Sequence, residues 1–217
     1  MKFCVLLSGG VDSALLLRRA LQRGDYVLPL YLRCGFVWET AELYWLRRLL
    51  RALRTPTLQP LQVIDLPIRP IYGAHWSLTG RRIPGARSAD RAVFLPGRNA
   101  LLLTAAAIAC ARERISTIAL GVLKGNPFGD ATPHFFSALA SALSQALGAP
   151  IHIVAPLRRM SKARLIQADA DAPFALTFSC LRPAAGYHHC GRCNKCAERR
   201  RAFRLAGITD PTVYAQH

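Results

Sequence analysis

The amino-acid sequence predicts an α/β protein with a parallel sheet of about five strands, flanking helices and a small C-terminal lobe held by a metal ion. Three observations lead to this prediction. Short apolar runs alternate with segments of helical periodicity through residues 1–170. The first apolar run enters a turn with two glycines, which precedes a helix. Four of the seven cysteines gather within residues 180–196.

The turn after the first predicted strand (3–7) indicates a phosphate-binding site. It reads Ser8-Gly9-Gly10-Val11-Asp12-Ser13 and leads into a predicted helix at 14–21. Its glycines allow a close backbone approach, its hydroxyl and N–H groups are donors, and the positive end of the helix dipole faces the anion. Asp12 is placed to hold Mg²⁺ or a polarised N–H. The alternative is a ligand-free turn. The spacing G-x-x-x-x-G-K-[ST] of kinases and GTPases is missing.

The remaining elements follow in strand–helix alternation, which favours a parallel sheet with right-handed crossovers. Further strands are predicted at 26–32, 61–66, 117–122 and 151–154. Helices are predicted at 41–53, 99–114, 133–147, 161–169 and 196–205, with Gly148 as a stop and Ser161 as an N-cap. Residues 67–91 are rich in proline and glycine and form a predicted lid or oligomer contact. We expect one domain at 1–170 and a metal-binding lobe at 171–217.

The charge of the chain has two interpretations. It carries 29 basic and 12 acidic residues, for a net charge of +17, and only four of the basic residues are lysine. A nucleic-acid surface is one interpretation, and an unspecific arginine-rich surface is the favoured one. Arginine also suits ATP, pyrophosphate and carboxylate ligands. No apolar run is long enough for a membrane span and no signal peptide is recognised, so we expect a cytoplasmic protein that does not contact membranes.

The clustered cysteines predict a structural zinc site. Cys180, Cys190, Cys193 and Cys196 have the spacing C-x9-C-x2-C-x2-C, which matches a closed tetrahedral site of four thiolates. An iron–sulfur cluster is the competing interpretation, although its typical spacings differ. The two histidines before Cys190 are not needed as ligands. The other cysteines have apolar surroundings and are predicted core residues: Cys4, Cys34 and Cys110.

Three motifs together resemble one enzyme family. They are the 8–13 turn, Pro96-Gly97-Arg98-Asn99 ahead of a long predicted helix, and the cysteine cluster followed by a basic helix. In order and separation they are similar to the QueC family, the 7-cyano-7-deazaguanine synthases, which are PP-loop ATP pyrophosphatases with a Rossmann-like sheet. The turn alone is shared with other PP-loop enzymes, whereas the other two motifs are more specific. The resemblance covers nearly the whole chain.

The resemblance implies an ATP-dependent carbon–nitrogen ligase of the queuosine pathway. Its cofactors would be ATP, Mg²⁺ and structural Zn²⁺. Its substrates would be 7-carboxy-7-deazaguanine and ammonia: the carboxylate is adenylated, ammonia gives the amide, and a second ATP leads to the nitrile. Such chemistry depends on positioning and on neutralising pyrophosphate. The resemblance also suggests a homodimer.

By position, the motifs assign candidate residues. Ser8 to Ser13 would cradle the pyrophosphate, with Asp12 and Ser13 also taking part in catalysis. Arg98 would contact phosphate or the substrate carboxylate. Asn99 would either cap the long helix or bind a ligand. Lys162 would either reach the phosphates or be an ordinary surface lysine.

Two loops depart from the family pattern, at 33–39 and 124–133. They hold further candidate substrate-binding residues, which are Phe36, Trp38, Phe128 and Asp130; the three aromatic rings would either stack on a base or belong to the core. The altered loops leave open a second enzyme class, in which the acyl-adenylate passes to an amine of a protein or nucleic acid, as in antiphage defence. A zinc-stabilised basic nucleic-acid binder is the non-enzymatic alternative.

Overall fold

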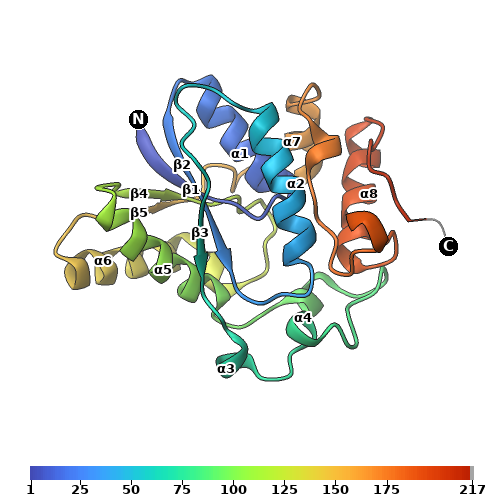
Figure 1. Cartoon of the computed structure of the whole chain (residues 1–217), viewed down its shortest axis with the longest axis horizontal. Coiled ribbons are helices and arrows are strands. Elements are labelled where there is room, and N and C mark those ends of the chain that lie inside the picture. The colour runs from blue at the N-terminus through green and yellow to red at the C-terminus, as the bar shows by residue number, and fades with distance from the viewer. Residues whose placement is uncertain (216–217) are drawn as a thin grey trace.

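Five parallel strands form the centre of the molecule, in the order β3-β2-β1-β4-β5 (Figure 1). They are β1 (Lys2–Leu6), β2 (Tyr26–Arg33), β3 (Gln62–Asp65), β4 (Thr117–Ala119) and β5 (His152–Val154). The computed structural model describes residues 1–215 of the 217-residue chain. The predicted parallel sheet is confirmed. Its strand order changes direction between β1 and β4, the place where doubly wound sheets bind ligands beyond the carboxyl ends of the strands.

Helices cover both faces of the sheet. In Figure 1, α1 (Val11–Gln22), α2 (Glu39–Ala52), α7 (Lys162–Ala168) and α8 (Asn194–Ala206) lie on one side of the strands, and α5 (Arg98–Arg112) and α6 (Pro133–Leu147) lie on the other. The side chains of β1 alternate between the two faces of the sheet, and each face is covered by its own set of helices. The odd-numbered residues of β1 pack in the same cluster as α1 and α7, whereas Cys4 packs in the cluster of α5 and α6. Apart from Lys2, which is exposed at its amino end, β1 therefore consists of apolar residues packed on both faces.

The helix ends agree with the turn chemistry of the sequence. Helix α6 has the predicted bounds, and Gly148 ends it in the left-handed conformation at φ +59°. Ser161 caps α7, because its hydroxyl accepts the N–H of Arg164 at 3.3 Å. Strands β4 and β5 are shorter than predicted, and α8 begins two residues before the predicted position.

Short elements surround the carboxyl ends of the strands. Within 67–91 the structure has two single-turn helices, α3 (Arg69–Tyr72) and α4 (Trp76–Thr79), which lie below the sheet in Figure 1. Single 3₁₀ turns occur at η1 (Asp90–Val93), η2 (Gly129–Ala131), η3 (Phe174–Leu176) and η4 (Ala185–Tyr187). The proline- and glycine-rich 67–91 segment thus contains two short helical turns joined by loops.

Helix α8 joins the C-terminal residues to the main core. Phe203 packs in the same apolar cluster as α1, with its ring edge-on to Phe174 at 5.1 Å. Arg199, which is 2% exposed, donates to the Phe174 carbonyl at 2.9 Å and pairs with Asp210 at 3.2 Å. Such a buried cation needs both kinds of partner. Among residues 1–215, no helix is both long and apolar enough to cross a membrane.

Candidate active site and metal centre

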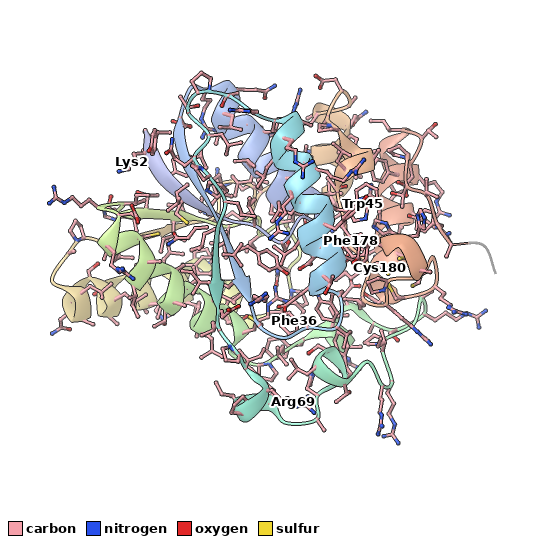
Figure 2. The ribbon with its side chains drawn as sticks, viewed as in Figure 1. Lys2, Phe36, Trp45, Arg69, Phe178 and Cys180 are labelled. Carbon is pink, nitrogen blue, oxygen red and sulfur yellow. The ribbon has the colours of Figure 1, made fainter. Side chains whose placement is uncertain are left out.

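A cavity of about 340 Å³ opens at the carboxyl ends of β1, β2 and β4. The 8–13 loop, the start of α2, residues 93–99 and the segment before the cysteine cluster all contribute to its wall. Figure 2 labels two of its lining residues, Phe36 after β2 and Phe178 close to Cys180. The volume falls within the range of small-molecule sites.

The 8–13 loop has the backbone geometry of an anion site. Gly9 has φ +71°, and the first helical residue of α1 follows Gly10. The Ser13 hydroxyl accepts the Ser8 N–H at 3.3 Å and donates to the Gly10 carbonyl at 3.2 Å, which holds the loop against the helix. The free N–H groups of the first turn of α1 are therefore available to an anion.

One glycine in this region was not singled out from the sequence. A Cβ atom on Gly121, just beyond β4, would lie 2.9 Å from the backbone of both Asp12 and Ser13. A side chain at position 121 would push the 8–13 loop away from the sheet. The signal was a glycine at the end of an apolar strand, where close backbone approach is common.

A cluster of alternating charges lies beside the loop. The Lys162 ammonium is 3.2 Å from Asp12 and also pairs with Glu198 of α8, which Lys195 contacts at 2.6 Å. The side chain of Lys162 is only 21% exposed, so the surface-lysine interpretation is wrong. Burial opposes its charge, but the carboxylates of Asp12 and Glu198 raise the pKa of Lys162 above its usual value.

Only one of the two carboxylate oxygens of Asp12 has a partner in the protein. Burial raises the pKa of its carboxyl, and Lys162 counteracts that shift. The second carboxylate oxygen, Oδ1, is buried without a hydrogen-bond partner. A buried acceptor without a hydrogen-bond partner costs free energy unless a bound molecule or ion contacts it. Mg²⁺ is one such ion, because it is coordinated by carboxylate oxygens.

The start of α5 corrects one prediction. Gly97, at φ +71°, occupies the N-cap position, so Asn99 does not cap the helix through its own side chain. Instead, the Asp130 carboxylate accepts the Asn99 N–H at 3.0 Å, and the Asn99 amide donates to the Asp130 carbonyl at 3.0 Å. The cap comes from a residue 31 positions away, which local sequence patterns do not show.

Arg98 lies between this cap and the aromatic side of the cavity. Its guanidinium carbon is 5.6 Å from the centroid of the Phe36 ring. Its Nε is buried and has no hydrogen-bond partner. The Arg98 side chain lines the cavity and has an N–H group that no protein acceptor uses. Such a donor is suited to an anionic ligand.

The candidate aromatic residues line the same cavity. The rings of Phe36 and Trp38 stack at 4.8 Å, and Trp38 lies 5.8 Å from Trp76 of α4. Phe128 stacks on Phe94 at 4.7 Å. These rings are packed against one another and also border the cavity; their stacking on a base stays a prediction.

Glu42 of α2 is a cavity residue that the sequence analysis missed. Its carboxylate accepts the Tyr31 hydroxyl at 2.7 Å. Burial raises the pKa of Glu42 to about 8, and hydrogen bonding from Tyr31 and the charge of Arg98 oppose that rise. The available signal was a glutamate one helical turn after Trp38 and one turn before Trp45 and Leu46.

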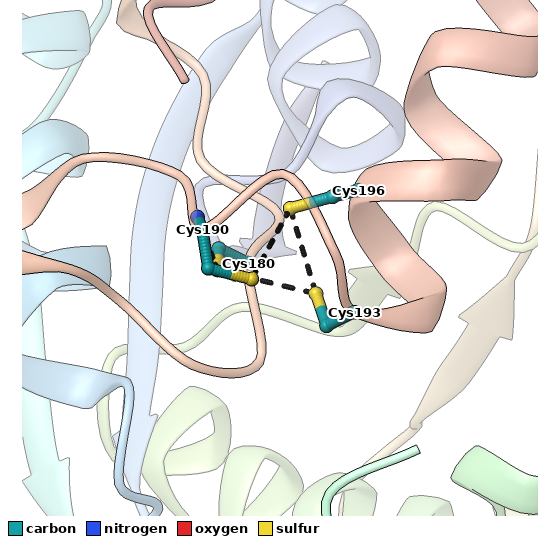
Figure 3. A group of neighbouring side chains, drawn as sticks. All are labelled: Cys180, Cys190, Cys193 and Cys196. Carbon is teal, nitrogen blue, oxygen red and sulfur yellow. Dashed lines mark hydrogen bonds between the residues drawn. The ribbon is translucent and has the colours of Figure 1, made fainter. Parts of the chain in front are cut away.

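The four clustered cysteines come together in a buried group that could hold a metal ion, as Figure 3 shows. One sulfur atom from each of Cys180, Cys190, Cys193 and Cys196 lies within 4.8 Å of the others. The backbone N–H groups of Leu181 and Arg182 point at these sulfurs, at 3.4 and 3.3 Å. Such donors stabilise thiolates, and four thiolates around one point suit a tetrahedral metal ion.

His189 has contacts of its own outside the four cysteines. Its Nε2 accepts the Ser179 N–H at 3.1 Å, and its ring packs against Phe178 at 4.6 Å. Burial lowers the pKa of His189 to about 3, so the ring is neutral at physiological pH. The histidine next to Cys190 therefore has a structural partner of its own.

Comparisons with known proteins agree with this site. The family model of the queuosine biosynthesis protein QueC matches residues 2–207. The chain is 35% identical to a 7-cyano-7-deazaguanine synthase of Brucella anthropi, with 99% of this chain and 94% of that protein covered. It is 33% identical to the synthase of Rhizobium meliloti, with 99% and 92% covered.

Solved structures share the fold at low identity. A predicted tRNA methyltransferase subunit from Methanocaldococcus jannaschii has a TM-score of 0.52 at 15% identity, with 100% of this chain and 93% of that one covered. A 4-thiouridine synthetase bound to RNA and ATP has the same TM-score and identity, with 95% and 50% covered. These likenesses concern the fold alone, whereas the family match and the curated relatives span nearly the whole sequence, so the chain belongs to the QueC family.

Proposed function

We propose that this protein is an ATP-dependent ligase that converts 7-carboxy-7-deazaguanine and ammonia into 7-cyano-7-deazaguanine. One observation carries the proposal: a single cavity joins the 8–13 loop and Lys162 to an aromatic wall that holds Arg98. In this proposal a phosphate site and a site for a flat acid share one cavity. Relatives that carry this enzyme name match the chain over 99% of its length.

The loop end would hold the phosphates of ATP. In this proposal Ser8, Gly9, Gly10, Val11, Asp12 and Ser13 surround the pyrophosphate, with the N-terminus of α1 directed at it. Lys162 supplies positive charge from the side of α7. The unpartnered Oδ1 of Asp12 fits a Mg²⁺ ligand. When bound there, the ion would neutralise charge on the phosphates.

The aromatic end would hold the deazapurine. The rings of Phe36, Trp38 and Phe128 provide a flat apolar wall, and Arg98 faces the cavity with an unused Nε–H donor. In this proposal Arg98 orients the substrate carboxylate toward the α-phosphorus. Asn99 and Asp130 fix the first turn of α5, so they position Arg98 instead of touching the substrate.

The chemistry requires two activations. A carboxylate oxygen attacks the α-phosphorus, pyrophosphate leaves, and the acyl-adenylate forms. Ammonia then attacks the acyl carbon, AMP leaves with the first oxygen, and a proton is lost to give the amide. The amide oxygen attacks the α-phosphorus of a second ATP and pyrophosphate leaves. AMP then departs with the amide oxygen, and the nitrogen loses both of its protons to give the nitrile. Both oxygens of the acid leave on AMP, so the protein needs to orient reactants and stabilise phosphate charge.

The cysteine cluster would hold a structural Zn²⁺. All four ligand positions of a tetrahedral ion are taken by thiolates, which leaves no position for a substrate. The cluster also borders the cavity, because Cys180 lines it. It is tied to the 67–91 segment as well, since the N–H of Asn194, the residue after Cys193, donates to the Pro84 carbonyl at 2.9 Å. In this proposal the metal stabilises both the C-terminal lobe and the 67–91 segment.

We further propose that 67–91 acts as a lid. His75, Trp76 and Ser77 line the cavity, while Gly85 is bridged to Cys193. One end of the segment therefore borders the substrate space and the other is fixed to the metal site. A segment so placed would exclude water from the acyl-adenylate. The homodimer stays a prediction.

The proposed function is tested by incubating the zinc-replete protein with Mg-ATP, ammonium and 7-carboxy-7-deazaguanine. Mass spectrometry should detect the nitrile together with about two molecules of AMP for each nitrile, as the two activations require. A matched reaction with Ser13→Ala protein should form little AMP, since the hydroxyl that holds the loop is gone. AMP release without any amide or nitrile would contradict the proposal and point to another acceptor.

A further inference from the structure

Glu42 is the cavity carboxylate that no structural pairing explains. Ion pairs occur at eleven places within residues 1–215, and none includes Glu42. Its carboxylate accepts a hydrogen bond from the Tyr31 hydroxyl at 2.7 Å. A charged side chain held inside a protein without an ion pair costs free energy. A ligand that donates hydrogen bonds would offset that cost.

The other carboxylates of the cavity are already engaged. Asp12 pairs with Lys162 beside the 8–13 loop, and Asp130 accepts two hydrogen bonds from Asn99. Glu42 differs because its carboxylate meets only neutral side-chain donors, the Tyr31 hydroxyl and the Trp38 side chain. Each carboxylate oxygen accepts two hydrogen bonds, so the Tyr31 contact leaves capacity for a ligand.

Glu42 also lies on the aromatic side of the cavity. Its N–H donates to the Trp38 carbonyl at 2.9 Å, so the two residues stand one helical turn apart at the start of α2. Trp38 stacks on Phe36, and Phe36 lies under Arg98. The cavity therefore places one anion and one cation around the same group of rings.

We propose that Glu42 is a specificity-determining residue that binds the N1–H and exocyclic 2-amino group of the guanine-type ring. This inference rests on the proposed function. A guanine-type base presents two adjacent donors on this edge, and one carboxylate accepts both in a bidentate pair. The adenine of ATP presents a donor beside an acceptor, which an ionised carboxylate would repel. Glu42 thus distinguishes the guanine-type ring of the acid substrate from the adenine of ATP.

Tyr31 takes the role of a positioning residue. Its hydroxyl fixes one oxygen of Glu42 from β2, while Trp38 borders the same carboxylate from the start of α2. The side chain is thereby held in one orientation before the ligand arrives. Preorganisation of this kind lowers the cost of binding.

The test compares 7-carboxy-7-deazaguanine with the same acid lacking the 2-amino group, in wild-type and Glu42→Gln protein. Wild-type protein should prefer the amino form in kcat/KM by roughly 10- to 100-fold, the usual value of a bidentate base contact. In the Glu42→Gln protein the preference should fall to about threefold or less, while KM for ATP stays within about twofold. Tyr31→Phe keeps the carboxylate but removes the hydroxyl that orients it, so its preference should lie between those of the wild-type and Glu42→Gln proteins.

The outcomes separate this inference from the function on which it rests. If wild-type protein does not adenylate the acid, both proposals fail. If it does and Glu42→Gln still prefers the amino form as strongly, only the role of Glu42 is overturned. A raised KM for ATP with unchanged preference would also overturn it and would place Glu42 at the adenine. Should Glu42→Gln not fold, Glu42→Asp retracts the carboxylate by one methylene and should show a reduced preference.

Discussion

The ammonium group of Lys162 lies 3.2 Å from the carboxylate of Asp12, which joins the loop after β1 to the start of α7. Glu198 of α8 pairs with the same ammonium. Lys162 therefore has one partner in the 8–13 loop and one on the helix that follows the cysteine cluster, so this charge cluster connects the two segments.

We expect Lys162→Gln to lower kcat/KM for ATP by about 100-fold or more. Loss of a preorganised charge at a transferring phosphate usually costs that much. Lys2→Gln is the matched control, because Lys2 is exposed at the opposite, amino end of β1 (Figure 2). Steady-state AMP formation measures the effect. Equal activity of the two variants would leave Lys162 with a structural role only.

Asp130→Ala should reduce both stability and activity. The substitution removes the acceptor of the Asn99 N–H, and loss of a helix cap costs about 1 kcal/mol. Because Arg98 is the first residue of α5, we also expect kcat/KM for the deazapurine to fall about tenfold or more.

Thr132→Ala is the control for that variant. Thr132 caps α6 by accepting the Phe135 N–H at 3.2 Å, so its loss should cost a similar free energy of unfolding. Thermal melting and kinetics are measured for both proteins. If the two variants lose activity equally, the effect of Asp130 reflects stability and not the position of Arg98.

The sequence predicted the parts of this molecule that depend on local patterns. The parallel sheet, the bounds of α6, the Ser161 cap and the grouping of the four cysteines all follow from periodicity, turn residues or spacing. Long-range partners were not accessible. The cap of α5 by Asp130 spans 31 positions, and the contact of Gly121 with the 8–13 loop spans more than 100. Glu42 looked like one more charge on an amphipathic helix until the fold placed it in the cavity.

The metal site is tested by elemental analysis of the purified protein. We expect about one zinc per chain, and Cys196→Ser should remove most of it, since a tetrahedral site needs all four thiolates. Loss of the metal should lower stability by about 3 kcal/mol or more, or roughly 6–12 °C in Tm. Cys110→Ala is the control. Cys110 is equally buried but packs in the core beside β4, so the zinc content of this variant protein should equal that of the wild type. Iron in place of zinc would contradict the assignment.

Substrate affinity should depend on pH through Glu42. Burial raises the pKa of Glu42 to about 8 in the free protein, so the carboxyl is mostly protonated at pH 6. A ligand edge with two donors binds the ionised form, and binding below pH 8 must release a proton. The Kd for 7-carboxy-7-deazaguanine should therefore weaken by up to about tenfold per pH unit from pH 8 to 6.

The other groups around Glu42 do not account for such a slope. The pKa of Tyr31 is raised far above this range by burial. Burial also raises the pKa of Glu39, although the backbone N–H groups that it accepts counteract the rise. The substrate carboxylate is already ionised. Calorimetric titration of wild-type and Glu42→Gln protein separates these groups, since only the wild-type protein should show the slope. A flat wild-type profile would mean that Glu42 binds as a neutral acid, with a donor of its own, and would favour the adenine edge instead.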